Sequence, residues 1–292
     1  MGYQLFTDAT ADMNDEMLAG IPHIEIIPME VLVGDKAYLY GPGGNLSIDE
    51  FYDMQRGGQF ACTSQISPDT YRTAFEPYLK TGKDILYLGF SSGMSGTMNS
   101  ANICAEALQE EYPMRKIRCT DTLCASVGEG FLVREAAKKQ AEGMELEELV
   151  EWVEKYRLKV CHWFTVDSFQ HLLHGGRVSA VTAAAGTALN IKPMLYVDEE
   201  GKLKVAEKPR GRKQAVKAKL ERMKSGRNPE LGKLVIIGHA DCTEVGKELY
   251  EQVQEQFPET EIIMADIGPV IGAHTGPGMS AVIYWGNNRY IK

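Results

Sequence analysis

The chain has 292 residues, of which 44% are hydrophobic and 24% charged, an ordinary composition for a soluble globular protein. Its net charge of −9 argues against a nucleic-acid-binding surface, which usually carries a basic excess. No apolar run is long enough to span a membrane, and the N-terminus lacks the basic start and apolar run of a signal peptide. We therefore expect a cytoplasmic protein without a transmembrane segment, with one large domain or two of about 150 residues.

Six cysteines are scattered along the chain. The closest pair, Cys119 and Cys124, has four intervening residues, which is wider than a redox CxxC motif and has no partner pair for a zinc site. This spacing indicates free thiols in a reducing compartment. We expect no metal site.

The first half of the chain alternates predicted strands and helices. Apolar runs rich in β-branched residues predict strands at 3–13 (running into a polar turn), 24–34 (a strand pair or one bent strand), 84–90 and 116–122. The predicted helices lie in 46–57, 67–82, 91–112 and 131–143.

Two of these helices have clear start signals. Ser47 is followed three residues later by Glu50, the pattern of a capping box, and Ser67 precedes Pro68, a favoured first helical residue. Residues 62–67, just before the second of these helices, are expected to form a polar loop.

Strands that alternate with helices through short turns predict a parallel sheet covered by helices. Ligands of such sheets bind beyond the carboxyl ends of the strands. Polar residues follow three of the predicted strands, at Thr7 to Thr10, after Phe90 and after Cys119. We therefore expect these loops to converge.

The pattern changes after a predicted helix at 145–158. The predicted strands are 159–166, 233–240, 261–268 and 279–286, with a hairpin around 198–201, and the predicted helices lie in 167–179, 212–226, 244–257 and in a small-residue segment that begins at 180. This mixture of hairpins and helices favours a domain boundary near Leu158, which gives domains 1–157 and 158–292.

The stretch SSGMSGT, residues 91–97, is a candidate anion site. Its glycines allow close backbone approach, and the helix that follows offers unpaired N–H groups. It lacks the lysine of a P-loop and the second spaced glycine of a nucleophile elbow. An ordinary helix cap explains the stretch equally well.

The stretch VIGAHTGPG, residues 270–278, places His274 among glycines, where a ligand could approach closely. We interpret it as a turn, for which a solvated histidine is the ordinary alternative. Thr63, Ser64 and Gln65 precede a helix and are a second polar candidate, with a capped loop as the alternative.

Basic residues gather at Arg177 and in a basic cluster between Lys208 and Lys219. Such a charge run is usually a solvated helix face. In a chain of net charge −9 it could also dock an acidic partner or meet phosphate groups.

Seven motifs stand in the order, and at about the spacing, of the DegV family, which the chain resembles over essentially its whole length. They are TDATAD, TSQISP, SSGMSGT, DTLCASVGEG, LLHGGRVS, LNIKPML and IGAHTGPG. The family's first motif usually reads Thr-Asp-Ser, where this chain has Ala9, and Tyr usually follows Gly-Thr in the third, where it has Met98. The resemblance implies an N-terminal three-layer α/β/α domain with a parallel sheet, a C-terminal α/β domain with a mixed sheet, and a lipid tunnel between them.

The resemblance further implies a bacterial protein that binds one long-chain fatty acid and presents its carboxylate to the ATP-binding subunit of a fatty acid kinase. The partner, with ATP and Mg²⁺, would form the acyl phosphate, so we expect this chain to be no enzyme and to need no cofactor. Transient membrane contact would fit such a role.

The resemblance also assigns residues to these roles. Those expected to bind the carboxylate are Thr63, Ser95 and His274, with Ser64, Gly96, Thr97 and Thr275 as a further head-group loop. Those expected to contact the kinase are Arg177 with Arg210 or Arg212. The tunnel lining is expected from residues 24–32 and 180–195.

Two other functions remain open from the sequence. One is an acyl-transfer or esterase-type enzyme with Ser95 as nucleophile and His274 as base. The other is a regulator that senses fatty acid and relays its presence to a protein partner.

Overall fold

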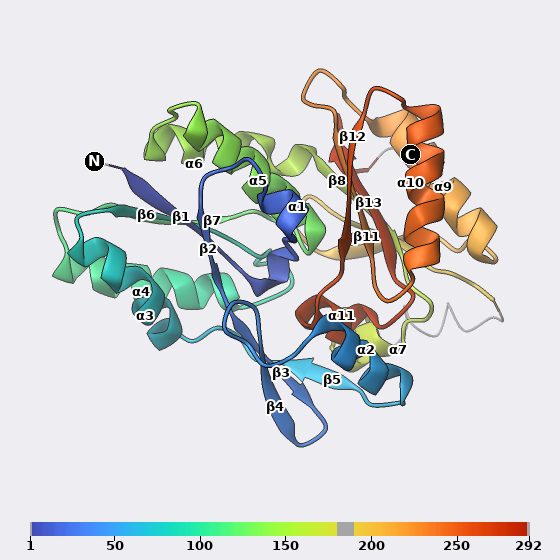
Figure 1. Ribbon diagram of the computed structural model, residues 1–292, viewed down its shortest axis with the longest axis horizontal. Helices are drawn as coiled ribbons and strands as arrows, with labels where there is room; N and C mark the ends of the chain where they lie inside the picture. The colour runs from blue at the N-terminus through green and yellow to red at the C-terminus, as the bar shows by residue number, and fades with distance from the viewer. Residues whose placement is uncertain (1, 180–189, 291–292) are drawn as a thin grey trace.

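The computed structural model describes residues 2–179 and 190–290. Figure 1 shows two lobes side by side, one built on the N-terminal half and one on the C-terminal half. The chain passes between them after helix α6 (Leu146–Tyr156), through the short 3-10 helix η2 (Arg157–Lys159). We keep the division into domains 1–157 and 158–292 as a prediction.

The N-terminal lobe contains a four-stranded parallel sheet in the order β2-β1-β6-β7. Its strands are β1 (Tyr3–Asp8), β2 (Ile24–Ile27), β6 (Asp84–Gly89) and β7 (Ile117–Asp121). Helices α3 (Pro68–Lys80) and α4 (Thr97–Glu111) cover one face, while α5 (Val127–Ala141) and α6 (Leu146–Tyr156) cover the other (Figure 1). The expected three-layer arrangement is confirmed.

Local sequence signals set the starts of two helices as expected. Ser47 and Glu50 form a complete capping box at α2 (Ile48–Arg56). Ser67 caps α3, with Pro68 as its first residue. Two short elements, η1 (Ala9–Ala11) and α1 (Asp15–Leu18), follow β1.

A small antiparallel sheet, β4-β3-β5, was only partly predicted. Its strands are β3 (Met29–Val33), β4 (Lys36–Tyr40) and β5 (Ala61–Thr63). The segment 24–34 is indeed two strands, β2 and β3, which Pro28 separates and which belong to different sheets. The polar loop expected at 62–67 is wrong in its first part, because Thr63 pairs with Val31 across the sheet.

The C-terminal lobe contains a mixed six-stranded sheet in the order β10-β9-β8-β13-β11-β12. Its strands are β8 (Val160–Thr165), β9 (Met194–Val197), β10 (Leu203–Glu207), β11 (Leu234–His239), β12 (Glu261–Asp266) and β13 (Ser280–Trp285). Only β11 and β12 pair in parallel, so the expected mixed sheet is confirmed. The helices of this lobe are α7 (Gln170–His174), α9 (Arg212–Gly226), α10 (Thr243–Gln256) and α11 (Pro269–Thr275).

This mixed sheet separates two hydrophobic cores, because successive side chains of a strand point to opposite faces. On β13, Ala281 and Ile283 belong to the core shared with the N-terminal lobe, while Val282 and Tyr284 belong to the core beneath α9 and α10. Helix α5 packs on the inner face, against β8 and β11. The inner face of the sheet is therefore turned toward the other lobe.

Two sequence predictions in this half need comment. Residues 270–275 are not a turn, because Pro269 starts the short helix α11, which ends at Gly276 with a φ of 71°. The small-residue helix expected from residue 180 falls mainly on 180–189, outside the described residues.

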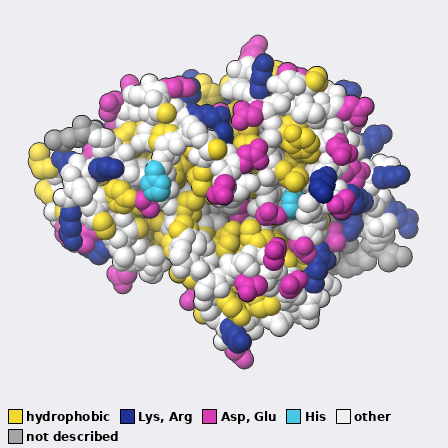
Figure 2. Space-filling model, viewed as in Figure 1, with side chains coloured by type: hydrophobic (Ala, Val, Ile, Leu, Met, Phe, Trp, Pro, Cys, Tyr) yellow, Lys and Arg dark blue, Asp and Glu magenta, His cyan; other side chains and the backbone are white. Residues whose placement is uncertain are grey.

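The surface carries charges of both signs. Figure 2 shows Lys and Arg side chains along the right-hand edge of the molecule, where α9 lies in Figure 1. In the described part of the chain, no helix combines the length and the apolar character needed to cross a bilayer.

Candidate functional site

A cavity lies between the two lobes, at the carboxyl ends of the parallel strands. Its space, the open mouth included, is about 760 Å³, within the range of small-molecule sites. The loops after β1, β6 and β7 contribute Thr10, Ser95 and Ser126 respectively. The predicted convergence of these loops is therefore confirmed.

Most of the wall is apolar and comes from the inner face of the mixed sheet and from α11. The apolar lining comprises Met29, Phe90, Met94, Ala125, Val127, Phe164, Leu172, Val197, Leu203, Val270, Ile271, Met279, Ala281 and Ile283. Of the expected lining segment 24–32, Met29 alone is in this set, and the other expected segment lies mainly outside the described residues. The long apolar wall suits a hydrocarbon chain, because each buried methylene contributes about 0.8 kcal/mol.

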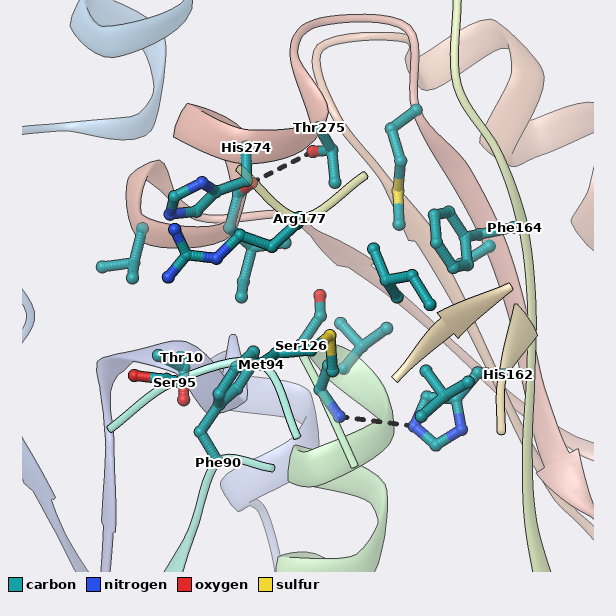
Figure 3. A pocket seen from close by; sticks show the side chains of 18 of the residues that line it. Thr10, Phe90, Met94, Ser95, Ser126, His162, Phe164, Arg177, His274 and Thr275 are labelled. Carbon is teal, nitrogen blue, oxygen red and sulfur yellow. Dashed lines mark hydrogen bonds between the residues drawn. The ribbon is translucent and has the colours of Figure 1, made fainter. Parts of the chain in front are cut away.

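Polar side chains gather where α11 meets β5. His274 Nε2 lies 2.9 Å from Thr63 Oγ1, across 211 positions of sequence. Both residues line the cavity, and Ser95 lines it as well. Figure 3 shows Ser95 on the wall formed by the N-terminal half, and His274 beside Arg177 on the other wall. The fold thus places the three residues expected at a head group in one cavity.

Ser95 is held by the start of α4. Its Oγ accepts a hydrogen bond from the backbone N–H of Thr97 at 3.2 Å and lies 2.9 Å from Thr97 Oγ1. Both contacts are with Thr97, the first residue of α4. The positive end of the α4 dipole is therefore close to Ser95, which favours an anion there.

His274 is a neutral imidazole at physiological pH. Burial, and then the charge of Arg177 and the neighbouring His174, lower its pKa to about 4. Gly175 packs directly against the ring, since a methyl group at its Cα would overlap Nδ1. Nδ1 is buried and has no hydrogen-bond partner among the described residues.

Arg177, expected as a kinase contact, lines the cavity and is half-buried. Its Nη1 donates to the carbonyl of Gly175, and burial lowers its pKa. Arg210 and Arg212, by contrast, are exposed and do not line the cavity.

The other residues expected at the head group do not all line the cavity. Thr275 lines the cavity, but its hydroxyl donates to the carbonyl of Ile271. Ser64 donates to Glu30 instead of facing the cavity. Gly96 packs against the side chain of Gln65.

No sequence motif pointed to His162, a buried polar residue in the cavity wall. Its Nδ1 lies 3.1 Å from the carbonyl of Val160 and therefore carries the proton. Its Nε2 lies 3.5 Å from the backbone N–H of Ala125 and accepts. Burial lowers its pKa well below 6.5, so this ring too is neutral. His162 stands in a predicted strand like any core residue, so only the fold reveals it.

Buried carboxyl groups behind Thr10 were also missed. Thr10 Oγ1 lies 2.5 Å from Asp8 Oδ1 and 2.8 Å from Glu129 Oε2. A hydroxyl has one hydrogen, so it can donate to only one of these carboxyl groups. The other must be protonated and donate to Thr10. Burial raises the pKa of both Asp8 and Glu129, which fits this count.

No group of three or more metal-binding side chains occurs among residues 2–179 and 190–290. The cavity thus presents hydroxyls, neutral imidazoles and one guanidinium above a long apolar wall. That donor set can hold an acid group attached to a hydrocarbon.

Comparisons with known proteins indicate one family. The DegV family model, described as "Uncharacterised protein, DegV family", matches residues 3–287. A DegV domain-containing protein of Clostridium perfringens is 38% identical over 287 residues, which cover 98% of each chain.

Two solved structures share the fold. A fatty-acid-binding DegV family protein from Thermus thermophilus has a TM-score of 0.85 at 28% identity, over 98% of this chain and 100% of that one. The fatty acid kinase B3 protein of Streptococcus pneumoniae, solved with linoleic acid, has a TM-score of 0.86 at 23% identity, with the same coverage. With sequence and structure in agreement over nearly their full length, the chain belongs to the DegV family.

Proposed function

We propose that this protein binds one long-chain fatty acid in the cavity and presents its carboxylate to a partner fatty acid kinase. The observation that carries the proposal is the cavity itself, which has a largely apolar wall and is also lined by Thr63, Ser95 and His274. Relatives at 28% identity, from Thermus thermophilus and Streptococcus agalactiae, bind fatty acids. The likeness to the kinase B3 protein supports the partner.

The hydrogen bonds of Thr63, His274 and Ser95 favour a carboxylate. When His274 Nε2–H donates to Thr63 Oγ1, the Thr63 O–H is free to donate to a carboxylate oxygen. Ser95 already accepts from Thr97, so its own O–H can also donate into the cavity. Two charge-assisted hydrogen bonds would then hold the acid group, and such bonds are stronger than neutral ones.

The hydrocarbon tail would supply the larger part of the affinity. About 14 methylenes at about 0.8 kcal/mol each give on the order of 11 kcal/mol before the cost of association. In the kinase reaction, an oxygen of the held carboxylate would attack the γ-phosphorus of ATP, which gives an acyl phosphate and ADP. This chain would supply the position of the carboxylate, and the partner would supply ATP and Mg²⁺.

The arrangement counts against an acyl-transfer enzyme. His274 Nε2 contacts Thr63, and Ser95 contacts Thr97, so the two proposed catalytic residues are not hydrogen-bonded to each other. Within the described residues, no carboxylate pairs with His274 to orient it as a general base. Hydrolysis of an activated ester by the protein alone would reverse this conclusion.

Native mass spectrometry of the protein purified from cells tests lipid binding. We expect one fatty acid per chain. Ser95→Ala and His274→Ala should weaken oleate binding about tenfold or more, since Ser95→Ala removes a hydrogen bond to the carboxylate and His274→Ala removes the donor that leaves the Thr63 O–H free for it. Ser92→Ala and His23→Ala change exposed residues and serve as matched controls. Wild-type affinity in both cavity variants would refute the head-group assignment.

A separate experiment tests presentation to the kinase. Arg210 is exposed and away from the cavity, so Arg210→Glu should leave oleate binding intact but reduce acyl phosphate formation. Arg177→Gln should reduce both, because Arg177 lines the cavity. If the kinase phosphorylated the fatty acid bound to Arg210→Glu as fast as that bound to the wild type, Arg210 would not belong to the proposed kinase surface.

A further inference from the structure

A second pocket lies on the outer face of the mixed sheet. Thr165 and Ser280 pair across β8 and β13 and line this pocket, while their neighbours Phe164 and Ala281 line the fatty-acid cavity. Alternation along the strands therefore puts the two sites on opposite faces of the sheet. The first turns of α9 and α10 also line it, through Ala215 and Val245, and so does Asp167, whose carboxylate pairs with Lys192.

The floor of this pocket is Lys219, whose side chain is fully buried. Its Nζ donates to Thr165 Oγ1 and to Ser280 Oγ, each at 2.8 Å. Both partners are neutral. In the described part of the chain no carboxylate lies within ion-pair distance of Nζ. The sequence suggested a solvated basic helix face here, which is correct for Lys213 and Lys217 but wrong for Lys219.

A buried ammonium without a counter-ion is costly, so such groups are normally paired. Burial lowers the pKa of Lys219 to about 7, as expected for a cation that lacks a fixed anion. The nearby Cys242 thiol does not supply the charge, because burial raises its pKa to about 11. The ammonium would therefore gain most from an anion that enters the pocket.

The surroundings offer further positive potential. Neither α9 nor α10 has a side-chain cap, and residues of the first turn of each helix line the pocket, so the positive ends of both helix dipoles lie beside it. Three more cations stand around it: Lys192, which pairs with Asp167, Arg212, which pairs with Glu248, and Arg56, which pairs with Asp241. These pairs leave Lys219 as the cation without a carboxylate partner.

We propose that this pocket is a second binding site, independent of the fatty-acid cavity, that takes a phosphate group with Lys219 Nζ as its central donor. A phosphate fits better than a planar carboxylate, because the charged donors approach from several directions, Lys219 from the floor and Lys192, Arg212 and Arg56 from the rim. The group could be free inorganic phosphate or part of a phosphate monoester, which have the same recognition chemistry.

Isothermal titration calorimetry at fixed ionic strength, without fatty acid or kinase, tests the site. Inorganic phosphate and glycerol 3-phosphate are the two probes, and the tighter one identifies the source of the group. Lys219→Met should weaken binding about tenfold or more, because it removes a hydrogen-bonded charge while keeping a long side chain. Lys213→Met, at an exposed position of the same helix, should change affinity less than about twofold.

If Lys219→Met does not fold, the double variant Lys192→Met with Arg212→Gln replaces it, since both residues are at the rim. That variant should bind phosphate several-fold more weakly. The proposal is overturned if neither probe shows saturable binding to the wild type, or if the folded variants bind as tightly as the wild type. Neither result would affect the fatty-acid site, which is on the other face of the sheet.

Discussion

His274 should resist protonation far below the pH at which histidine ordinarily titrates. Its pKa is lowered from 6.5 to about 4, first by burial and then by the positive charge of Arg177 and by His174. The difference of about 2.5 pH units corresponds to on the order of 3 kcal/mol against the imidazolium. The ring therefore meets its ligand as a neutral hydrogen-bonding group.

The sign of the effect on stability follows from the same shift. Between about pH 4 and pH 6.5 the unfolded chain binds a proton at His274 that the folded protein does not. The free energy of unfolding should therefore fall as the pH falls through this window, by up to on the order of 3 kcal/mol from this residue. His274→Gln removes this contribution, so the variant should lose less stability than the wild type between pH 6.5 and 4.5.

The direct assay is an NMR titration of protein labelled in the histidine rings, with His274→Gln to assign the signal. In the ligand-free wild type, the ring should stay neutral down to about pH 5. Arg177→Gln should raise the pKa, because it removes a nearby positive charge. Bound oleate should raise it as well, since its carboxylate adds a negative charge beside the ring.

Two results would refute the reasoning. One is titration of His274 near pH 6.5 in the ligand-free protein, which would mean that the ring is solvated. The other is a pKa that bound oleate leaves unchanged, which would place the carboxylate elsewhere.

Three further changes test other parts of the structure. An alanine at position 175 fits the local backbone, whose φ is −75°, but its methyl group would push against the His274 ring. Gly175→Ala should therefore lower oleate affinity about tenfold or more, measured by displacement of a fluorescent fatty acid. Unchanged affinity would contradict the packing of Gly175 against His274. Glu129→Gln should stay within about 1 kcal/mol of wild-type stability in urea at about pH 4, where the acid is protonated in the folded and largely in the unfolded chain, because a protonated acid and an amide are alike. Since burial raises the pKa of Glu129, the free energy of unfolding of the wild type should fall as the pH rises above 4.5. If the free energy of unfolding of Glu129→Gln fell equally with pH, Glu129 would not be protonated in the folded protein. Ala281→Phe fills part of the cavity and should reduce binding of long acids more than of short ones in the same displacement assay, whereas an equal effect on both would place the tail elsewhere.

Local signals in the sequence determined most of the secondary structure. Ser47 with Glu50, and Ser67 with Pro68, fix helix starts through contacts between near neighbours. The alternation of apolar strands with helices determined the parallel sheet, since only crossover connections join parallel strands. Short elements such as β5 could not be predicted from local signals, because the three residues of β5 are ordered by pairing with β3.

The site was determined by the sequence in one respect and by the fold in another. The ordered motifs pointed to Thr63, Ser95 and His274, and the described structure brings all three into one cavity. The residues that line the cavity could not be predicted from the sequence. The face of a strand that is turned inward depends on the elements that pack against it.

Burial decided the remaining features. The sequence predicted that Lys219 is one more charge on a solvated basic helix, but the fold buries it against Thr165 and Ser280. Glu129 had no predicted role beyond its place in the motif DTLCASVGEG, and the fold encloses it with Asp8. The charge state of such groups depends on the water and neighbours that surround them, and residues far apart in the chain supply those neighbours.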